Sequence, residues 1–184
     1  MTSRPRQTNW LSYLEAARRK GEIARYHLEK LHCYLDPDAS QYHLSVAVQA
    51  HFEGVVFSVM AAVDQTAQAI NSALHLGARE SDLFEKAFGE LAPTIAGLEA
   101  WRGKLLGRDL RRLRTKAIHY SYEKSQDQQG LRWVVQEVGV RYQGSRELRD
   151  YCEAAVHHVE ELIGLIPAVE SELRRRLAFS SVVR

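Results

Sequence analysis

Apolar residues recur every three or four positions along the first two segments of the chain, which predicts two long amphipathic helices. The first is expected over 9–35 and ends at Asp36-Pro37-Asp38. Its apolar stripe is Leu14, Ala17, Gly21, Ala24, Leu28, Leu31 and Leu35. The second is expected over 43–75, with the stripe Val48, Phe52, Val55, Val56, Val59, Met60, Val63, Ala67, Ile70 and Leu74. We expect Gly77 to cap its end.

The remaining pattern predicts three further elements. A short helix is expected over about 80–90, and a long helix runs from 94, after Pro93, to about 123. Residues 131–143 alternate and are rich in β-branched side chains, which predicts either a short β-hairpin or an extended excursion. A last helix is expected over 146–178, with Ser145 as N-cap and a bend at Pro167. The prediction is an all-α, up-and-down bundle of four long helices plus a short one, one domain over 1–184 with its core at about 9–178.

Composition places this chain among ordinary globular proteins. It has 184 residues, 45% hydrophobic and 26% charged, with a formal net charge of +2. The longest apolar run, 54–63, is about half the length needed to span a bilayer. Together with an N-terminus that lacks an apolar leader, this predicts a cytoplasmic protein without a membrane partner. Cys33 and Cys152 are expected to be buried free thiols.

The helix expected over 94–123 carries a local excess of positive charge. Between 102 and 119 there is one negative side chain, Asp109, so the excess is six. The seven positive side chains are Arg102, Lys104, Arg108, Arg111, Arg112, Arg114 and Lys116. Such a field attracts phosphate, although a merely solvated helix face would also account for it.

Helical projection separates this segment into two faces. Leu106, Leu110, Leu113 and Ala117 form a core-facing stripe, and Arg108, Arg112, Thr115 and His119 form a second stripe beside it. Arg114 lies about 140° from His119 on an ideal helix. If Arg114 and His119 act together, either the helix is distorted or the site is built across a two-fold axis.

The stretch Arg114-Thr115-Lys116-Ala117-Ile118-His119 resembles the R-x4-6-H motif of the HEPN (higher eukaryotes and prokaryotes nucleotide-binding) superfamily. The long, charge-poor helix before it and the terminal helix after it extend the resemblance over roughly residues 10–170. The resemblance implies a dimeric helical bundle and a metal-independent ribonuclease whose Arg and His meet across the dimer. It also implies a toxin or defence role, with a cognate antitoxin or defence partner.

Two departures from the superfamily pattern leave alternatives open. Thr115 stands where the superfamily often has Asn, and Tyr120 and Tyr122 flank the position where a toxin subgroup has its tyrosine. Arg112 also satisfies the loose motif spacing and shares a face with His119. We therefore keep both Arg112 and Arg114 as partners of His119.

RNA cleavage by the 2′-hydroxyl needs a proton donor or acceptor near neutral pH and a cation on the phosphoryl oxygens. Histidine and arginine supply these two roles. Arg108, Arg111 and Lys116 are candidate phosphate contacts. Tyr120 and Tyr122 are candidates for base stacking or for simple helix-end packing. We expect no metal and no other cofactor.

Glu53 and Asp64 are the formal charges between Ser45 and Leu74, and they lie three turns apart on one face of the second helix. One interpretation is that Glu53 or Asp64 binds the motif arginine or lines the site. Alternatively, each is a structural acid paired with a base of a neighbouring helix, because an unpaired acid there would be costly.

Two functions follow as hypotheses. The first is a metal-independent endoribonuclease of HEPN type, acting as a homodimer on RNA through Arg114 and His119. The alternative is a catalytically inactive module that binds nucleotide, RNA or a partner protein.

Overall fold

A computed structural model describes residues 10–34, 46–104, 107, 110 and 145–182, and within these ranges the regular structure is entirely helical. The helices are α1 (Trp10–Tyr34), α2 (Val46–Leu74), α3 (Leu83–Leu91), α4 (Leu98–Arg102) and α7 (Ser145–Val182). The all-α prediction is confirmed. The segment expected as a β-hairpin, 131–143, lies outside the described residues.

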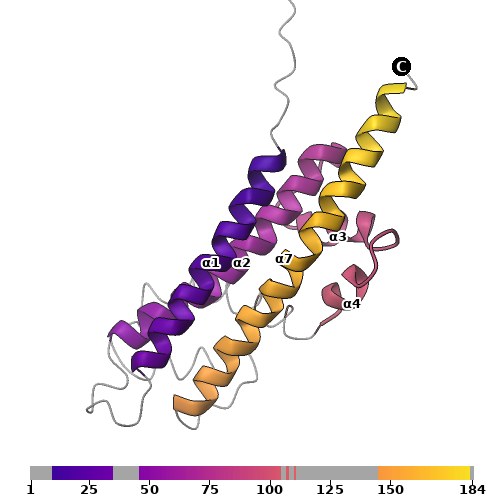
Figure 1. Ribbon diagram of the computed structural model, residues 1–184. Coiled ribbons are helices and arrows are strands. Elements are labelled where there is room, and N and C mark those ends of the chain that lie inside the picture. Colours follow the sequence, from indigo (N-terminus) through magenta and orange to yellow (C-terminus); the bar gives the residue numbers. More distant parts are fainter. Residues whose placement is uncertain (1–9, 35–45, 105–106, 108–109, 111–144, 183–184) are drawn as a thin grey trace, which may run out of the picture.

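The long helices α1, α2 and α7 lie side by side and form the body of the molecule (Figure 1). α1 runs antiparallel to α7, because Arg18 near its start contacts Glu170 and His32 near its end contacts Glu153. α2 packs along α1 in the opposite direction and is therefore parallel to α7. The short helices lie to one side, with α3 against α2 and α4 against α7.

The core consists of two clusters stacked along the bundle. The first, which we call the lower core, lies between the C-terminal half of α1, the first half of α2 and the start of α7, and it includes Leu110. The second, the upper core, adds α3 and α4 to the other ends of the long helices. Most members of the two stripes expected from the periodicity are buried, whereas Leu28 and Leu74 are half-buried and Leu35 lies outside the described residues. The buried members are Leu14, Ala17, Gly21, Ala24 and Leu31 on α1 and Val48, Phe52, Val55, Val56, Val59, Met60, Val63, Ala67 and Ile70 on α2. On α7 the buried residues that repeat at helical spacing are Cys152, Ala155, Val159, Leu162, Ile166, Val169 and Leu173.

The helix expected from residue 94 does not run unbroken through its first part. Gly97, with φ 84°, takes a left-handed conformation before α4, and Gly103 ends α4 after five residues. Glycine is a poor helix former, and a positive φ cannot continue a right-handed helix. Helical conformation returns at Gly107 and Leu110, both of them buried.

α2 ends at a different residue from the one expected to cap it. His75 itself adopts the left-handed conformation, with φ 53°, directly after Leu74. The amide of Leu76 then donates to the carbonyl of Asn71 at 3.2 Å, the long-range bond of a Schellman motif. Gly77 also has a positive φ, of 61°, but it lies two residues beyond this cap.

α7 is continuous from Ser145 to Val182 and passes through Pro167.

The two cysteines differ, which corrects the expectation of two buried thiols: Cys152 is buried in the lower core, whereas Cys33 is exposed near the end of α1. Burial raises the pKa of the Cys152 thiol far above its ordinary value. Among the described helices, none has the length and apolar character to span a bilayer.

Candidate functional site

The residues expected to carry the chemistry lie outside the described residues. This holds for Arg114 and His119 and equally for Arg108, Arg111, Arg112, Thr115, Lys116, Tyr120 and Tyr122. The structure bears on the site through the residues that precede this segment and through the helices beside which it begins.

Leu110 fixes where the basic segment begins. Its side chain is fully buried in the lower core, together with residues of α2 such as Phe52 and of α7 such as Tyr151. Of the core-facing stripe expected for this segment, Leu110 is the member that the structure describes, and its burial agrees with that expectation. The segment that contains the Arg-His motif therefore starts at the lower core, four residues before Arg114.

Trp101 anchors the chain upstream of that point. Its indole N–H donates to the carbonyl of His158 at 2.9 Å, and its ring stacks on the His158 imidazole with centroids 4.8 Å apart. Both side chains are buried. A buried aromatic pair combined with a hydrogen bond ties α4 to α7, so the chain that leads into the basic segment is held in place.

Two cations of the basic run form ion pairs. Arg102 donates to both oxygens of Glu99 and also reaches Glu85 of α3 at 3.3 Å. Lys104 contacts both carboxylate oxygens of Glu161 on α7. Hydrogen bonding to Glu99 raises the pKa of Arg102 above its ordinary value. Arg102 therefore contacts an acid of α3 and Lys104 an acid of α7, and the five other cations of the run belong to the segment from residue 108 onward.

The two acids expected on the second long helix both lie on α2. Glu53 and Asp64 are both half-buried on α2, and each takes part in an interaction, so neither carboxylate is without a partner. This fits the requirement that an acid on an apolar helix be compensated. Glu53 directly follows Phe52, a member of the lower core to which Leu110 also belongs.

Sequence analysis did not single out a histidine pair between α1 and α2. The Nδ1 atoms of His27 and His51 are 3.0 Å apart. The ring centroids are 5.3 Å apart. This equals the distance between the two Nδ1 atoms plus the distance from each nitrogen to the centre of its own ring, so the two Nδ1 atoms face each other along the line that joins the rings. One imidazole must therefore donate its Nδ1–H while the other accepts on a bare Nδ1.

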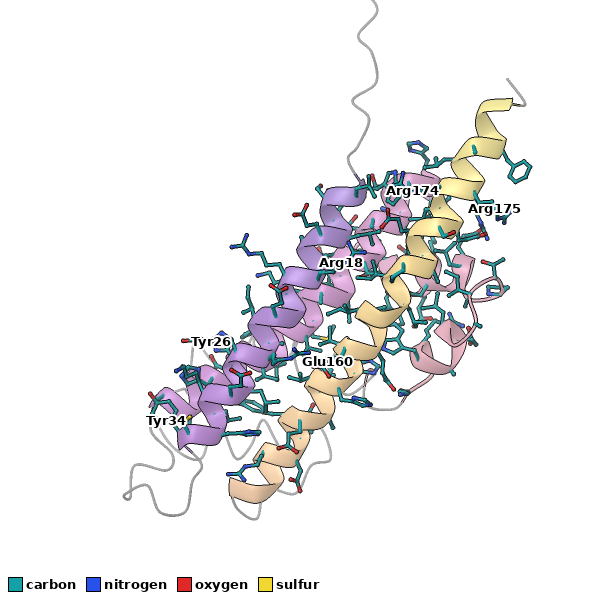
Figure 2. All side chains as sticks on the ribbon, in the orientation of Figure 1. Arg18, Tyr26, Tyr34, Glu160, Arg174 and Arg175 are labelled. Atoms are coloured by element: carbon teal, nitrogen blue, oxygen red, sulfur yellow. The ribbon has the colours of Figure 1, made fainter. Side chains whose placement is uncertain are left out.

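Aromatic rings and a glycine surround this pair. Tyr34 stacks on His51 with centroids 5.5 Å apart, and Tyr26 meets His27 edge-on. Figure 2 shows Tyr26 and Tyr34 on the side of α1 away from α7. Gly54 makes room for His27, because a Cβ at this position would lie 2.5 Å from the His27 Nδ1.

Burial lowers the pKa of His27 below its ordinary value, and the charge of His51 lowers it further. A spacing signal for the pair was present in the sequence, since Ala24, His27, Leu31 and Tyr34 follow the 3–4 rhythm of the core stripe. That rhythm places His27 beside the stripe. It does not say which residue of α2 lies opposite, because this depends on the register between the two helices.

Contacts between basic and acidic side chains follow the seam between α1 and α7. Arg25 donates two hydrogen bonds to Glu160, Arg18 lies 3.6 Å from Glu170, and His32 lies 3.0 Å from Glu153. The three α1 residues are seven positions apart, so they form one row along the helix. Arg18 and Glu160 mark this seam in Figure 2.

In the part of the chain that the structure describes, no group of three or more His, Cys, Asp or Glu side chains is placed to hold a metal ion. No protein-family model matches the chain, and no curated protein or solved structure matches it.

Proposed function

We propose that this protein is a metal-independent endoribonuclease of HEPN type, with an Arg/His site assembled at a homodimer interface. The observation that carries the proposal is the motif Arg114-Thr115-Lys116-Ala117-Ile118-His119 in a chain that forms an all-α bundle. His119 is the proton donor or acceptor. Arg114 or Arg112 stabilises charge on the phosphoryl oxygens. A toxin or defence role with a cognate partner is part of the same proposal.

The surroundings of the motif support this assignment. Leu110 is buried, so the segment begins beside the long α2 helix, which carries Glu53 and Asp64. Upstream, Trp101 is anchored on α7, and Arg102 and Lys104 are paired with acidic side chains. A positioned arginine and histidine can act on a phosphate without a metal, because the 2′-hydroxyl of RNA is the nucleophile.

The test is cleavage of single-stranded RNA in EDTA, with analysis of the product ends. The wild type should leave 2′,3′-cyclic phosphates. Loss of a general acid or base should slow cleavage about 10²–10⁴-fold in His119→Ala. His157→Ala on the exposed face of α7 is the matched histidine control, and Arg19→Ala on α1 is the control for Arg112→Ala and Arg114→Ala. Equal cleavage by the wild type and His119→Ala would refute the proposal.

One observation favours a second function. Thr115 stands after the motif arginine where the superfamily often has Asn, which is a departure next to the reacting groups. An inactive module would bind RNA, nucleotide or a partner protein through the same cations without cleaving it. Binding of RNA that weakens steeply with salt, without any product in EDTA, would identify this alternative.

A further inference from the structure

The cations of α1 differ between its two sides. On the side toward α7, Arg18 and Arg25 are both paired with acids of that helix. On a helical projection, the side toward α2 carries Lys20 and Lys30. Within the part of the chain that the structure describes, neither lysine forms an ion pair, and the Nζ of Lys30 lies over the ring of Tyr26 instead. The α2 side of α1 therefore carries positive charge that no described carboxylate neutralises.

Two exposed tyrosines flank Lys30. Tyr26 is 51% exposed and Tyr34 is 43% exposed, and Figure 2 shows both on the side of α1 away from α7. The three residues are four positions apart, so they follow one row along the helix, and the two tyrosines are separated by about 12 Å along its axis. We call this sequence of ring, ammonium and ring the tyrosine row.

Histidines hold both rings of the tyrosine row. Tyr34 stacks on His51 of α2 at an interplanar angle of 19°, and Tyr26 meets His27 edge-on. The contact between the Nδ1 atoms of His27 and His51 joins these two supports. Because His51 covers one face of Tyr34, the exposed part of this ring is its other face and its edge. A ring that is already oriented loses little conformational entropy when a second ring stacks on it.

Acidic side chains of α1 lie on the other side of the row. The pKa of Arg25 is raised first by its hydrogen bond to Glu160 and further by the charges of Glu29 and Glu22. Both acids therefore act on the side of α1 that faces α7, in agreement with their helical positions. A polyanion lying along the α2 side of the row would meet ammonium groups rather than these carboxylates.

We propose that the tyrosine row binds unpaired bases of single-stranded RNA, with Lys30 contacting the phosphates between two stacked bases. Aromatic rings combined with cations bind single strands, because every base has a π face and every nucleotide carries a phosphate. The choice of RNA rests on the proposed ribonuclease function. The row lies in the half of α1 that supplies Leu31 to the lower core, to which Leu110 also belongs, so bound RNA would lie at the same end of the bundle as Leu110.

Fluorescence anisotropy tests the row, with a labelled, unstructured single strand of 2′-O-methyl RNA, which lacks the nucleophilic hydroxyl and stays intact. Tyr34→Leu keeps an apolar side chain but no ring, so its Kd should rise about 5- to 150-fold, and Tyr26→Leu should act in the same way. Tyr34→Phe keeps the ring and should bind as the wild type. Phe179→Leu, which changes an exposed ring near the end of α7, is the matched control and should also bind as the wild type.

Two further measurements examine the phosphate contact and the strand. Lys30→Gln should lower the slope of log K against log salt concentration by about 0.7, the value for one contact to a single strand. Arg79→Gln, an exposed cation between α2 and α3, should leave the slope unchanged. In a duplex of the same length the bases stack on each other, so Tyr34→Leu should not change its binding.

Three outcomes would overturn the tyrosine row as an RNA site: no binding by the wild type, the same Kd in the wild type and both leucine variants, or Tyr34→Phe binding as weakly as Tyr34→Leu. Circular dichroism confirms that each variant folds, and Tyr26→Leu carries the test if Tyr34→Leu does not. Failure of the ribonuclease looks different. Binding that depends on the tyrosines, without cleavage of ordinary RNA in EDTA, would refute the ribonuclease and support the row.

Discussion

At the scale of the residue, the imidazole of His27 is partly removed from water and contacts α2 and the imidazole of His51. Burial and the charge of His51 both disfavour its protonated form, so its pKa is lower in the folded protein than in the unfolded chain. The unfolded chain then binds more protons in the interval between the two values.

The free energy of unfolding therefore decreases as the pH falls through this interval. The contribution of His27 is unchanged above its ordinary pKa of about 6.5 and is lost progressively as the pH falls below it toward the folded value. We expect the urea midpoint of the wild type to fall across that interval. His27→Gln should flatten the fall, and His157→Gln should not. A wild type and His27→Gln with parallel profiles would contradict the assignment.

His75 is a second residue whose local conformation has a measurable cost. It is exposed, and it holds φ 53° at the end of α2. A side chain with a Cβ is disfavoured there, whereas glycine is not. His75→Gly should therefore raise the free energy of unfolding by about 1 kcal/mol. His75→Ala keeps a Cβ and should show no such gain, which chemical denaturation of the two variants can check.

At the scale of the element, the approach of α1 to α2 depends on the absence of a side chain at Gly54. A Cβ there would meet three atoms of the His27 ring, the nearest at 2.5 Å. Gly164 on the exposed side of α7 is the natural comparison, because a Cβ there would meet nothing within 4 Å. The two glycines thus differ in what surrounds them, although both lie inside long helices.

This comparison predicts opposite effects for the same substitution. Gly164→Ala should stabilise the protein by about 0.5–1 kcal/mol through helix propensity alone. Gly54→Ala has the same propensity gain but must displace the His27 ring, and overpacking of this kind costs about 1–3 kcal/mol. Thermal unfolding should raise the midpoint of Gly164→Ala and lower that of Gly54→Ala. An equal rise in both would show that the His27 ring moves freely.

Periodicity predicted the long helices because one rule fixes both their existence and their buried face. Leu14, Ala17, Ala24 and Leu31 share one stripe on α1, and these residues are buried as expected. Periodicity failed at Gly97 and Gly103, where backbone conformation and the anchoring of Trp101 on α7 outweigh the apolar spacing. It also could not pair His27 with His51, since that contact depends on the register of two helices.

At the scale of the whole molecule, the proposed site depends on whether one subunit or two supply its arginine and histidine. Arg114 and His119 lie on different faces of an ideal helix, so a shared site needs either a distorted helix or two subunits. Charge counting could not predict that Arg102 and Lys104 are paired, because the acids that they contact lie on α3, α4 and α7. Sequence spacing places residues on one helix, and the pairing between helices requires the fold.

Mixing two inactive variants separates the two possibilities. If Arg114 of one subunit meets His119 of the other, a mixture of Arg114→Ala and His119→Ala protein contains heterodimers with one intact site. After subunit exchange, cleavage should return to about a quarter of the wild-type rate. The same experiment with Arg112→Ala identifies which arginine is used. Sedimentation must show a dimer, and a mixture that stays inactive although subunits exchange would place both groups in one chain.

The burial of Leu110 also bears on the entropy of the chain. Leu110 and the residues of α7 from Tyr151 onward belong to the same core cluster, so two points that are far apart in the sequence meet in the lower core. Bringing two such points together costs conformational entropy, which grows slowly with their separation, by about 0.6 kcal/mol for each doubling. The burial of Leu110 in this cluster offsets that cost, so the lower core joins distant parts of the chain as well as excluding water.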